Sequence, residues 1–438
     1  MSERILILGA ARSGQWMARL LREQGVCATL SDLKLTGADL PEDLRDLPFL
    51  AGDFRETWLD DFDALLISPG VAQDSPPVLA ARARGLRVTG EMEESFRLSQ
   101  TPVAAITGTN GKSTTTTLLS LILEASGLEA PAGGNLGRPA SQIVLEQPKA
   151  DVHVLEVSSF QAETFHQFHP KVATLLNLTP DHLDRYTDFE SYVEAKLRCF
   201  AAMSAEDTLV LPQDPNLERR LEKLPTRRLA FGCAEESGDG AFYSEGRILV
   251  RYEGRVQDVM PLEELGVLGR HNLANALAAL AMALPLGLNA EGAAQALREF
   301  KGLPHRMEYA GKLGPLACYN DSKATNVEAA LASLSGLEAS ILLIAGGRDK
   351  GGDFGILARE LPGLRRVYAI GEAAPAILEA FGDRAVEAKD LSGALAAAAK
   401  EGRDGEMLIL SPACSSFDQF RDFEARGEAF MNLVKEGL

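Results

Sequence analysis

The sequence predicts an α/β protein of three domains, and three observations support this fold class. Short apolar runs with the length of strands alternate with helical patterns along the chain. Polar or Gly-rich segments directly follow most of these runs, as in parallel sheets that bind ligands beyond the carboxyl ends of their strands. At roughly 150 residues per domain, 438 residues suggest about three domains, each large enough for its own core.

The first domain is predicted at residues 1–92. A strand at 5–8 meets a Gly-rich turn, a helix extends to about Gly25, and a second strand ends at Asp32. The alternation continues in two further apolar runs, at 64–67 and 86–88. This βαβ pattern predicts a small Rossmann-like domain.

The second domain is predicted at residues 93–300, where the pattern restarts with a strand at 103–106, a loop at 108–113 and a helix to about Ser126. Two later runs are continuously apolar, as expected for parallel strands buried on both faces: 152–157 and 172–178. Short alternating runs with Gly turns predict antiparallel hairpins at 228–261. An Ala/Leu-rich helix is predicted to follow at 271–286. We therefore expect a mononucleotide-binding parallel sheet with a small antiparallel portion.

The third domain is predicted at residues 301–438, after a hinge at Gly302-Leu303-Pro304. Its apolar runs again alternate with helical patterns, and the expected strands are 316–319, 341–345, 367–370 and 407–410. This pattern predicts a second Rossmann-like domain at the carboxyl-terminal end of the chain.

Composition and charge exclude several function classes. The formal net charge is -18, so the average surface field repels nucleic acids and anionic membranes. The five cysteines are scattered and form no C-x-x-C pair, which argues against a disulfide framework and a zinc knuckle. No apolar run reaches 18 residues, so we expect no membrane insertion. The sequence favours a cytoplasmic enzyme, and we expect a monomer.

The strongest motif follows the strand at 103–106 and opens a helix. Its glycines would let backbone N–H groups surround a phosphate, its lysine would reach the β/γ-phosphates, and its hydroxyls would bind Mg²⁺. The residues are Gly108, Thr109, Asn110, Gly111, Lys112, Ser113 and Thr114. The usual P-loop motif, G-x-x-x-x-G-K-S/T, would have a glycine where this sequence has Ile106. The difference disfavours a P-loop motor or GTPase. The alternative is a Gly/Thr-rich helix start without a ligand.

With six further segments, this motif resembles the Mur ligases over all three predicted domains. The segments are GTNGKST (108–114), EVSSFQ (156–161), NLTPDHLDRY (177–186), GRHN (269–272), LPHR (303–306), DSKATN (321–326) and SPACSSFDQF (411–420). The resemblance implies that ATP phosphorylates a carboxylate and that an amine then attacks the acyl phosphate. Within the family, DSKATN favours the branch that adds D-glutamate to UDP-N-acetylmuramoyl-L-alanine, and the missing Asp-Asn-Pro-Arg stretch disfavours the branch that adds a diamino acid.

The resemblance implies a magnesium site of two ions, with Ser113 or Thr114 from the loop as a ligand. Glu156 ends an apolar strand, where a carboxylate is unfavourable unless a cation meets it. His182 is similar to the family's histidine at the second metal, and Lys196 to its carbamylated lysine. An unmodified ammonium would be repelled by two divalent ions. The ordinary alternatives are a salt-bridged Glu156, a structural His182 and a solvated Lys196.

The resemblance also implies three groups of binding residues. The residues expected to contact ATP, besides the loop, are Asn272, Arg306 and Asp321. The residues expected to bind the incoming amino acid are Lys323, Thr325, Lys350, Ser416 and Phe423. The residues expected at the UDP portion of the other substrate are Arg12, Ser13, Asp32, Lys34, Gly70 and Asn135. Helix caps and core packing are the alternatives for Asp321, Ser416 and Phe423.

Three other functions compete with this interpretation. A sister Mur ligase or a folylpolyglutamate ligase would share the chemistry and differ in substrate. An NAD-binding dehydrogenase would use the first βαβ unit and Asp32, but the turn at Gly9–Gly14 lacks the middle glycine of the dinucleotide motif. A non-catalytic nucleotide-binding regulator would keep the loop at 108–114 without needing Glu156, His182 and Lys196 together.

Overall fold

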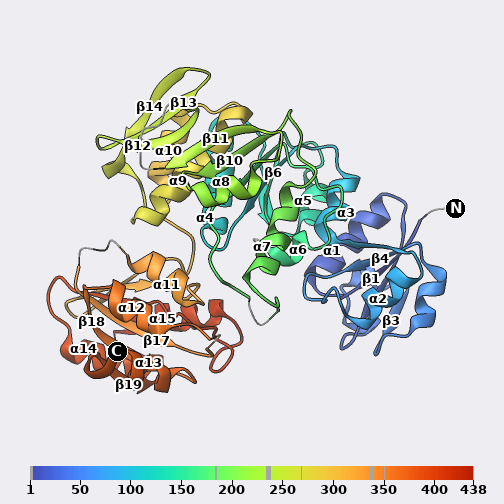
Figure 1. The fold of residues 1–438 in the computed structure, drawn as a ribbon. Coiled ribbons are helices and arrows are strands. Elements are labelled where there is room, and N and C mark those ends of the chain that lie inside the picture. Colours follow the sequence, from blue (N-terminus) through green and yellow to red (C-terminus); the bar gives the residue numbers. More distant parts are fainter. Residues whose placement is uncertain are drawn as a thin grey trace. The chain divides into compact units, whose positions relative to one another are not determined.

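The computed structural model describes residues 3–135, 137–182, 185–232, 238–267, 269–335, 337, 339–349 and 351–437 (Figure 1). By its internal contacts the chain forms two compact units: Met1–Glu264 with Asn275–Leu297, and Leu265–Ala274 with Arg298–Leu438. The α/β class is confirmed, because the strands form mainly parallel sheets with helices between them. Each sheet lies inside one predicted domain, and the predicted boundaries stay predictions.

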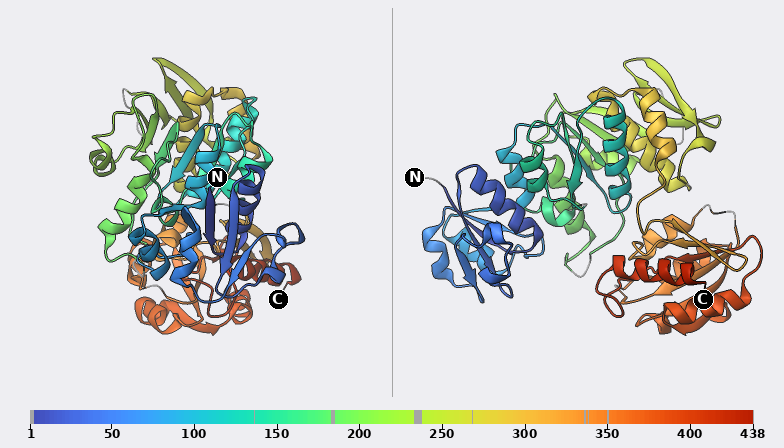
Figure 2. Two further views of the ribbon diagram at one scale, coloured as in Figure 1. Left: turned by 90° about the vertical axis from the view of Figure 1, so that its right-hand side faces the viewer. Right: turned by 180° about the vertical axis from the view of Figure 1, so that it is seen from behind.

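The N-terminal sheet is parallel, with strand order β3-β2-β1-β4-β5. Its strands are β1 (Arg4–Leu8), β2 (Cys27–Asp32), β3 (Phe49–Ala51), β4 (Ala64–Ile67) and β5 (Arg87–Gly90). Its helices are α1 (Arg12–Glu23), α2 (Pro76–Ala83) and α3 (Glu91–Leu98), with 3-10 turns η1 (Gly37–Asp39), η2 (Glu42–Leu44) and η3 (Glu56–Asp61). α1 packs Met17 and Leu21 against Ile5, while α2 packs Val78 against Leu65 on the opposite face. Figure 2 shows this domain in blue from two further sides.

The order of these strands brings three segments to one edge of the sheet. β1 lies between β2 and β4, so the segments after these three strands are neighbours. The approach is close, because a Cβ on Gly9 would lie 2.3 Å from the Ser68 Oγ, and Gly9 itself has φ +107°. Asp32 follows on the other side and accepts a hydrogen bond from the Ala10 backbone N–H (2.9 Å). The predicted UDP-contacting segments of this domain therefore share one edge.

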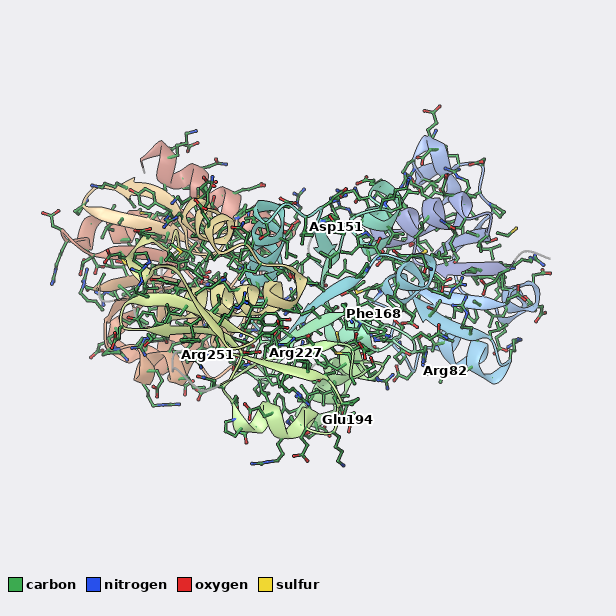
Figure 3. The ribbon with its side chains drawn as sticks, turned by 90° about the horizontal axis from the view of Figure 1, so that it is seen from above. Arg82, Asp151, Phe168, Glu194, Arg227 and Arg251 are labelled. Carbon is green, nitrogen blue, oxygen red and sulfur yellow. The ribbon has the colours of Figure 1, made fainter. Side chains whose placement is uncertain are left out.

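The central sheet has the order β14-β13-β12-β11-β10-β9-β6-β8-β7. Its strands are β6 (Val103–Thr107), β7 (Ala132–Gly134), β8 (His153–Glu156), β9 (Val172–Leu175), β10 (Thr208–Pro212), β11 (Arg227–Gly232), β12 (Gly240–Ser244), β13 (Arg247–Tyr252) and β14 (Arg255–Pro261). Its helices are α4 (Lys112–Ala125), α5 (Ala140–Glu146), α6 (Ser159–Ala162), α7 (Phe189–Leu197), α8 (Pro215–Leu221), α9 (Arg270–Ala283) and α10 (Ala290–Glu299), with η4 (Arg198–Phe200), η5 (Leu262–Glu264) and η6 (Leu284–Leu286). Phe168 lies in the core under this sheet (Figure 3).

The antiparallel portion is smaller than the sequence predicts. β12, β13 and β14 pair antiparallel, as expected, but β11 pairs parallel with both β10 and β12. β11 follows the helix α8, which carries the chain back to the same end of the sheet and makes a parallel pairing with β10 possible. Arg227 on β11 and Arg251 on β13, both labelled in Figure 3, mark this region.

The C-terminal sheet has the order β15-β16-β20-β17-β18-β19, with β15 and β16 antiparallel and the other pairs parallel. Its strands are β15 (Glu308–Leu313), β16 (Leu316–Asn320), β17 (Ile341–Gly346), β18 (Leu364–Ile370), β19 (Ala385–Lys389) and β20 (Met407–Leu410). Its helices are α11 (Val327–Leu334), α12 (Phe354–Glu360) and α13 (Ala374–Phe381) on one face, and α14 (Leu391–Glu401) and α15 (Phe423–Glu436) on the other, with η7 (Gly382–Arg384). The segments after β16, β20 and β17 are therefore neighbours.

Among the helices that the structure describes, none is both long and apolar enough to cross a lipid bilayer.

Candidate active site

The loop at 108–114 lies between β6 and α4, as the sequence predicts. β6 is buried along its whole length, and the loop leaves its carboxyl end beside β9. The Asn110 N–H donates to the Asn177 side-chain oxygen (2.9 Å), and the Asn177 amide donates back to the Asn110 carbonyl (3.0 Å). The Thr109 hydroxyl meets the Tyr192 hydroxyl at 2.9 Å. These contacts fix the loop at the N-terminus of α4, where backbone N–H groups favour an anion.

Gly111 is required by the backbone and by the packing of the loop. It is the N-cap of α4 with φ +86°, a left-handed conformation that costs other residues about 1–2 kcal/mol. A Cβ at this position would also lie 2.3 Å from the side-chain oxygen of Asn275. The close approach of Asn275, from α9, therefore leaves room only for glycine.

We expect Gly111→Ala to lower the free energy of unfolding by about 1–3 kcal/mol and to impair ATP binding, because both strain and the contact with Asn275 would move the loop. Gly127→Ala is the matched control, since Gly127 has φ +89° with nothing within 4 Å of the added Cβ. Urea unfolding and ATP titration measure both effects. Equal ATP affinity in the two variants would contradict this role of Gly111.

Lys112 is the first residue of α4, and its ammonium turns back over the loop. Its Nζ donates to the carbonyl oxygens of Gly108 (2.9 Å) and Thr109 (2.7 Å). Ser113 and Thr114, the predicted Mg²⁺ hydroxyls, follow it and are buried. The positive charge of Lys112 thus lies at the same helix N-terminus as the N–H groups of the loop.

Glu156 is the last residue of β8 and lies next to the loop. β8 pairs with β6 so that Glu156 is opposite Ile106, two residues before Gly108. The side chain is 2% exposed, and its Oε1 accepts a hydrogen bond from the Asn135 side-chain amide (2.7 Å). Asn135 was predicted as a substrate contact, and the structure shows that it orients Glu156. A buried carboxylate here suits a hard cation.

Lys196 is buried directly behind the loop. Its Nζ donates to the Gly108 carbonyl (2.8 Å) and lies 4.7 Å from the centre of the Tyr192 ring. The side chain is 2% exposed, so the solvated alternative is wrong. Burial, with the nearby Lys112 charge, holds the pKa of Lys196 well below its usual value. The amine is therefore easier to deprotonate than a surface lysine.

His182 lies in the segment after β9, against the rings of Phe160 and Tyr192. It has φ +55°, an uncommon conformation for a non-glycine residue, and its ring centre lies 4.7 Å from that of Phe160. The carboxylate of Asp181 approaches its Nε2 to 3.6 Å. Tyr192 contacts both this ring and Thr109. The structure therefore brings His182 and the phosphate loop to one cluster; Leu183 and Asp184 of the quoted motif lie outside the described residues.

The predicted metal set contains few acidic ligands. Among the described residues, no group of three or more His, Cys, Asp or Glu side chains could hold a metal ion. The predicted set instead combines Glu156 and His182 with two hydroxyls and Lys196. Its oxygen donors fit Mg²⁺, which commonly keeps waters and binds through one or two carboxylates together with substrate phosphates. These residues could hold Mg²⁺ once a nucleotide supplies phosphate oxygens.

The predicted UDP-contacting residues of the N-terminal domain lie along its shared edge. Arg12, Lys34 and Gly70 are exposed there, with Ser13 half-buried. Asp32 also has a structural role, because its carboxylate accepts the backbone N–H groups of Ala10, Lys34 and Leu35. Partial burial acts to raise its pKa, yet these hydrogen bonds hold the pKa below its usual value. Asp32 therefore fixes the turn in addition to any ligand contact.

Two of the three predicted ATP contacts of the other unit line one cavity of about 270 Å³. Asn272 and Arg306 line it with Tyr309 and Tyr319. Asp321 is buried close by, accepting from the Ser411 hydroxyl (2.8 Å) and the Met307 N–H (3.3 Å). Burial raises the pKa of Asp321 to about 6 despite these hydrogen bonds and the charge of Arg306. The structure brings these three predicted residues together.

The residues predicted to bind the incoming amino acid lie on the neighbouring segments after β16 and β20. The Lys323 ammonium is 5.2 Å from the centre of the Phe423 ring, and Thr325 lies two residues further along. Ser416 is 2% exposed at the end of the other segment. Lys350 lies outside the described residues. The described members of this predicted group therefore share one edge of the C-terminal sheet.

Sequence reasoning missed residues that hold these segments in place. Tyr192 and Asn177 fix the phosphate loop, Asn275 fills the space beside Gly111, and Arg185 bonds both the Pro69 carbonyl (3.1 Å) and Glu163 (2.8 Å). Arg185 and Asn177 were inside the quoted motifs, which was the available signal. Tyr192 and Asn275 lie within helical patterns that carry no such signal.

Family models match all three predicted domains. The Mur ligase MurD-like, N-terminal domain matches residues 3–90, the Mur ligase middle domain matches 106–283, and the Mur ligase, glutamate ligase domain matches 305–414. The order and spacing of these matches agree with the resemblance found in the motifs.

Known proteins are similar over nearly the full chain. UDP-N-acetylmuramoylalanine--D-glutamate ligase of Geotalea uraniireducens (strain Rf4) is 40% identical over 446 residues, covering 99% of this chain and 98% of its own. The ligase of the same name from Alkaliphilus metalliredigens (strain QYMF) is 38% identical over 446 residues, with the same coverage. The crystal structure of MurF ligase from Thermotoga maritima in complex with ADP shares the fold, with TM-score 0.63, 17% identity and coverage of 100% of this chain and 96% of that chain. This chain belongs to the Mur ligase family.

Proposed function

We propose that this protein is an ATP-dependent ligase that joins D-glutamate to UDP-N-acetylmuramoyl-L-alanine during synthesis of a peptidoglycan precursor. The family membership and the names of the relatives support this proposal. The observation that carries the chemistry is the loop at 108–114, with Lys112 at the N-terminus of α4 and Glu156 and Lys196 beside it. This arrangement suits a nucleotide triphosphate whose terminal phosphoryl group is transferred.

In the proposed reaction, a carboxylate oxygen of the muramoyl-alanine substrate attacks the γ-phosphorus of ATP, and ADP leaves. The amine of D-glutamate then attacks the carbonyl carbon of the acyl phosphate, loses a proton and releases phosphate as the amide bond forms. N–H groups of the loop and the Lys112 ammonium stabilise the charge on the transferring group. Mg²⁺, when bound, would neutralise phosphate charge.

Glu156, His182, Ser113 and Thr114 are the residues that we propose for Mg²⁺, with Lys196 as a carbamate. The donor set supports this proposal, since carboxylate and hydroxyl oxygens are preferred by hard cations. A carbamate forms when the neutral amine adds CO₂ and loses a proton, which replaces a buried cation by an anion. The buried position of Lys196 next to Lys112 favours that replacement.

Binding roles are proposed for the other predicted residues. Asn272, Arg306 and Asp321 would contact ATP, and the cavity that Asn272 and Arg306 line supports this assignment. Lys323, Thr325, Lys350, Ser416 and Phe423 would bind D-glutamate, while Arg12, Ser13, Asp32, Lys34, Gly70 and Asn135 would bind the UDP-linked substrate. Because both ATP and the nucleotide-linked precursor are cytoplasmic metabolites, we place the reaction in the cytoplasm. The monomeric state stays a prediction, which light scattering would check.

The proposed function predicts a narrow choice of amino acid. Phosphate release from ATP, with Mg²⁺ and UDP-N-acetylmuramoyl-L-alanine, should be at least about 10²-fold faster with D-glutamate than with L-glutamate, meso-diaminopimelate or L-lysine, because a site built for polar groups rejects ligands that leave them unpaired. A higher rate with a diamino acid would favour a sister Mur ligase. Activity only with a folate acceptor would favour a folylpolyglutamate ligase. No ATP consumption with any acceptor would reject ligation altogether.

A further inference from the structure

Arg426 is a buried guanidinium without an assigned function. It lies in the first turns of α15 and is 1% exposed. Its hydrogen bonds, as far as the described residues show, all go to neutral oxygens. It donates to the Ser322 hydroxyl (3.0 Å), the Ser322 carbonyl (2.9 Å), the Cys414 carbonyl (3.1 Å) and the Gly346 carbonyl (3.5 Å).

This position is unfavourable for a cation on two grounds. Burial removes the hydration of the guanidinium and lowers the pKa of Arg426 to about 10. The N-terminus of a helix, where α15 begins at Phe423, also carries a positive partial charge. Neutral oxygens accept all of its hydrogen bonds that the described residues show, and the carboxylate of Asp418 acts on the charge without one of these bonds and offsets the effect of burial only in part. A bound anion close to this edge of the sheet would stabilise the charge further.

The contacts of Arg426 reach the three neighbouring segments at one edge of the C-terminal sheet. Ser322 follows β16, Gly346 ends β17, and Cys414 follows β20. The packing is tight, because a Cβ on Gly347 would lie 3.1 Å from the Arg426 Nη1 and 2.2 Å from the Ser415 carbonyl. One side chain thus fixes the relative positions of all three segments.

The same segments carry the residues assigned to the amino acid. The Ser322 hydroxyl, which accepts from Arg426, donates to the Phe423 carbonyl (2.9 Å). Lys323 follows Ser322 and lies against the Phe423 ring. Ser416 is two residues beyond Cys414 and is buried. Arg426 therefore contacts the residue next to Lys323 and the residue two positions before Ser416.

We propose that Arg426 is a positioning residue of the amino-acid site, and that its charge favours an incoming amino acid that carries a second carboxylate. It acts through Ser322, Gly346 and Cys414 and does not touch the substrate. This inference rests on the proposed function, since it concerns the site of the amino acid in that reaction. It predicts a specific loss of affinity for the dicarboxylic substrate when the charge is removed.

The test compares three variants of the full-length protein. Arg426→Gln removes the charge, and Arg426→Lys keeps it. Arg365→Gln is the matched control, because Arg365 is a partly buried arginine of the same unit. It pairs with Glu406 (2.6 and 2.8 Å) near the N-terminal end of β18, whereas Arg426 lies beyond the carboxyl ends of the strands. Initial rates give separate KM values for D-glutamate, ATP and UDP-N-acetylmuramoyl-L-alanine, and thermal unfolding monitors the fold.

We expect Arg426→Gln to raise the KM for D-glutamate at least about tenfold, with the other two KM values within about threefold of the wild type. Arg426→Lys should lie nearer the wild type, and Arg365→Gln should alter stability alone. An unchanged D-glutamate KM in Arg426→Gln, or a parallel rise of all three KM values, would overturn the inference.

Two further outcomes are also decisive. If Arg426→Gln does not fold, Arg426→Met replaces it, because methionine keeps an apolar stem. If neither neutral variant folds, Arg426 is a core residue and the inference is withdrawn. If the wild-type protein ligates another amino acid but not D-glutamate, the proposed function itself is overturned. This result is seen with the wild type alone, so it is distinct from any result with an Arg426 variant.

Discussion

Replacing Lys112 by alanine is expected to slow ligation by at least about 10²-fold, the effect of losing one preorganised charge at a transferring phosphoryl group. The Lys112 ammonium lies over the carbonyls of Gly108 and Thr109, at the N-terminus of α4. A γ-phosphate in this loop would gain a direct positive partner that water cannot replace. Because that charge matters most in the transition state, kcat should fall together with kcat/KM.

Phosphate release with both acceptors measures this effect. Lys171→Ala is the matched control, since Lys171 is a half-exposed lysine of the same unit, near Asp207 (3.6 Å) and away from the loop. The control should keep nearly full activity, and both variants should unfold near the wild-type temperature. Wild-type rates in a folded Lys112→Ala would remove the basis for the nucleotide site.

The fold was largely predictable because buried parallel strands have a strong apolar pattern. The strands β1, β6, β8 and β17 lie within about two residues of their predicted positions. β7 was not predicted, because its Ala-Gly-Gly sequence has little strand propensity. β15 was also missed: its pairing with β16 shifts between Tyr309 and Gly311, which breaks the alternation that identifies a strand. The apolar pattern therefore identified most strands in the middle of the sheets, although it missed β10, while β7 and β15 lie at sheet edges.

The candidate site was predictable only where its residues follow a strand. Lys112 and Glu156 lie beyond or at the ends of β6 and β8, so topology alone brings them together. Tyr192 and Arg426 come from helices, where an isolated tyrosine or arginine in the sequence is typical of an ordinary surface position. Their burial results from tertiary packing of segments about 80 to 100 residues apart, such as Arg426 on Ser322. No local pattern contains that information.

Replacing Lys196 by alanine is expected to reduce turnover at least about 10²-fold and to leave the melting curve nearly unchanged. The pKa of Lys196 is lowered, so the folded protein disfavours its ammonium form. At a pH below the usual lysine pKa, the charge on Lys196 therefore lowers the stability of the fold. Removing the side chain therefore has a small net effect on folding. Its loss from the loop, where Nζ bonds the Gly108 carbonyl, would remove the proposed anionic ligand of Mg²⁺.

Lys196→Arg separates the two possible roles of the side chain. Arginine keeps a positive charge and a donor for the Gly108 carbonyl, but its guanidinium does not form a stable carbamate, so both variants should be inactive if the anion is required. ¹³C NMR after equilibration with ¹³C-bicarbonate should show a carbamate signal in the wild type that Lys196→Ala lacks. Substantial activity in Lys196→Arg would mean that Lys196 acts as a cation bound to the loop. Full activity in Lys196→Ala would dismiss both roles, because a buried lysine beside the phosphate loop would then be structural.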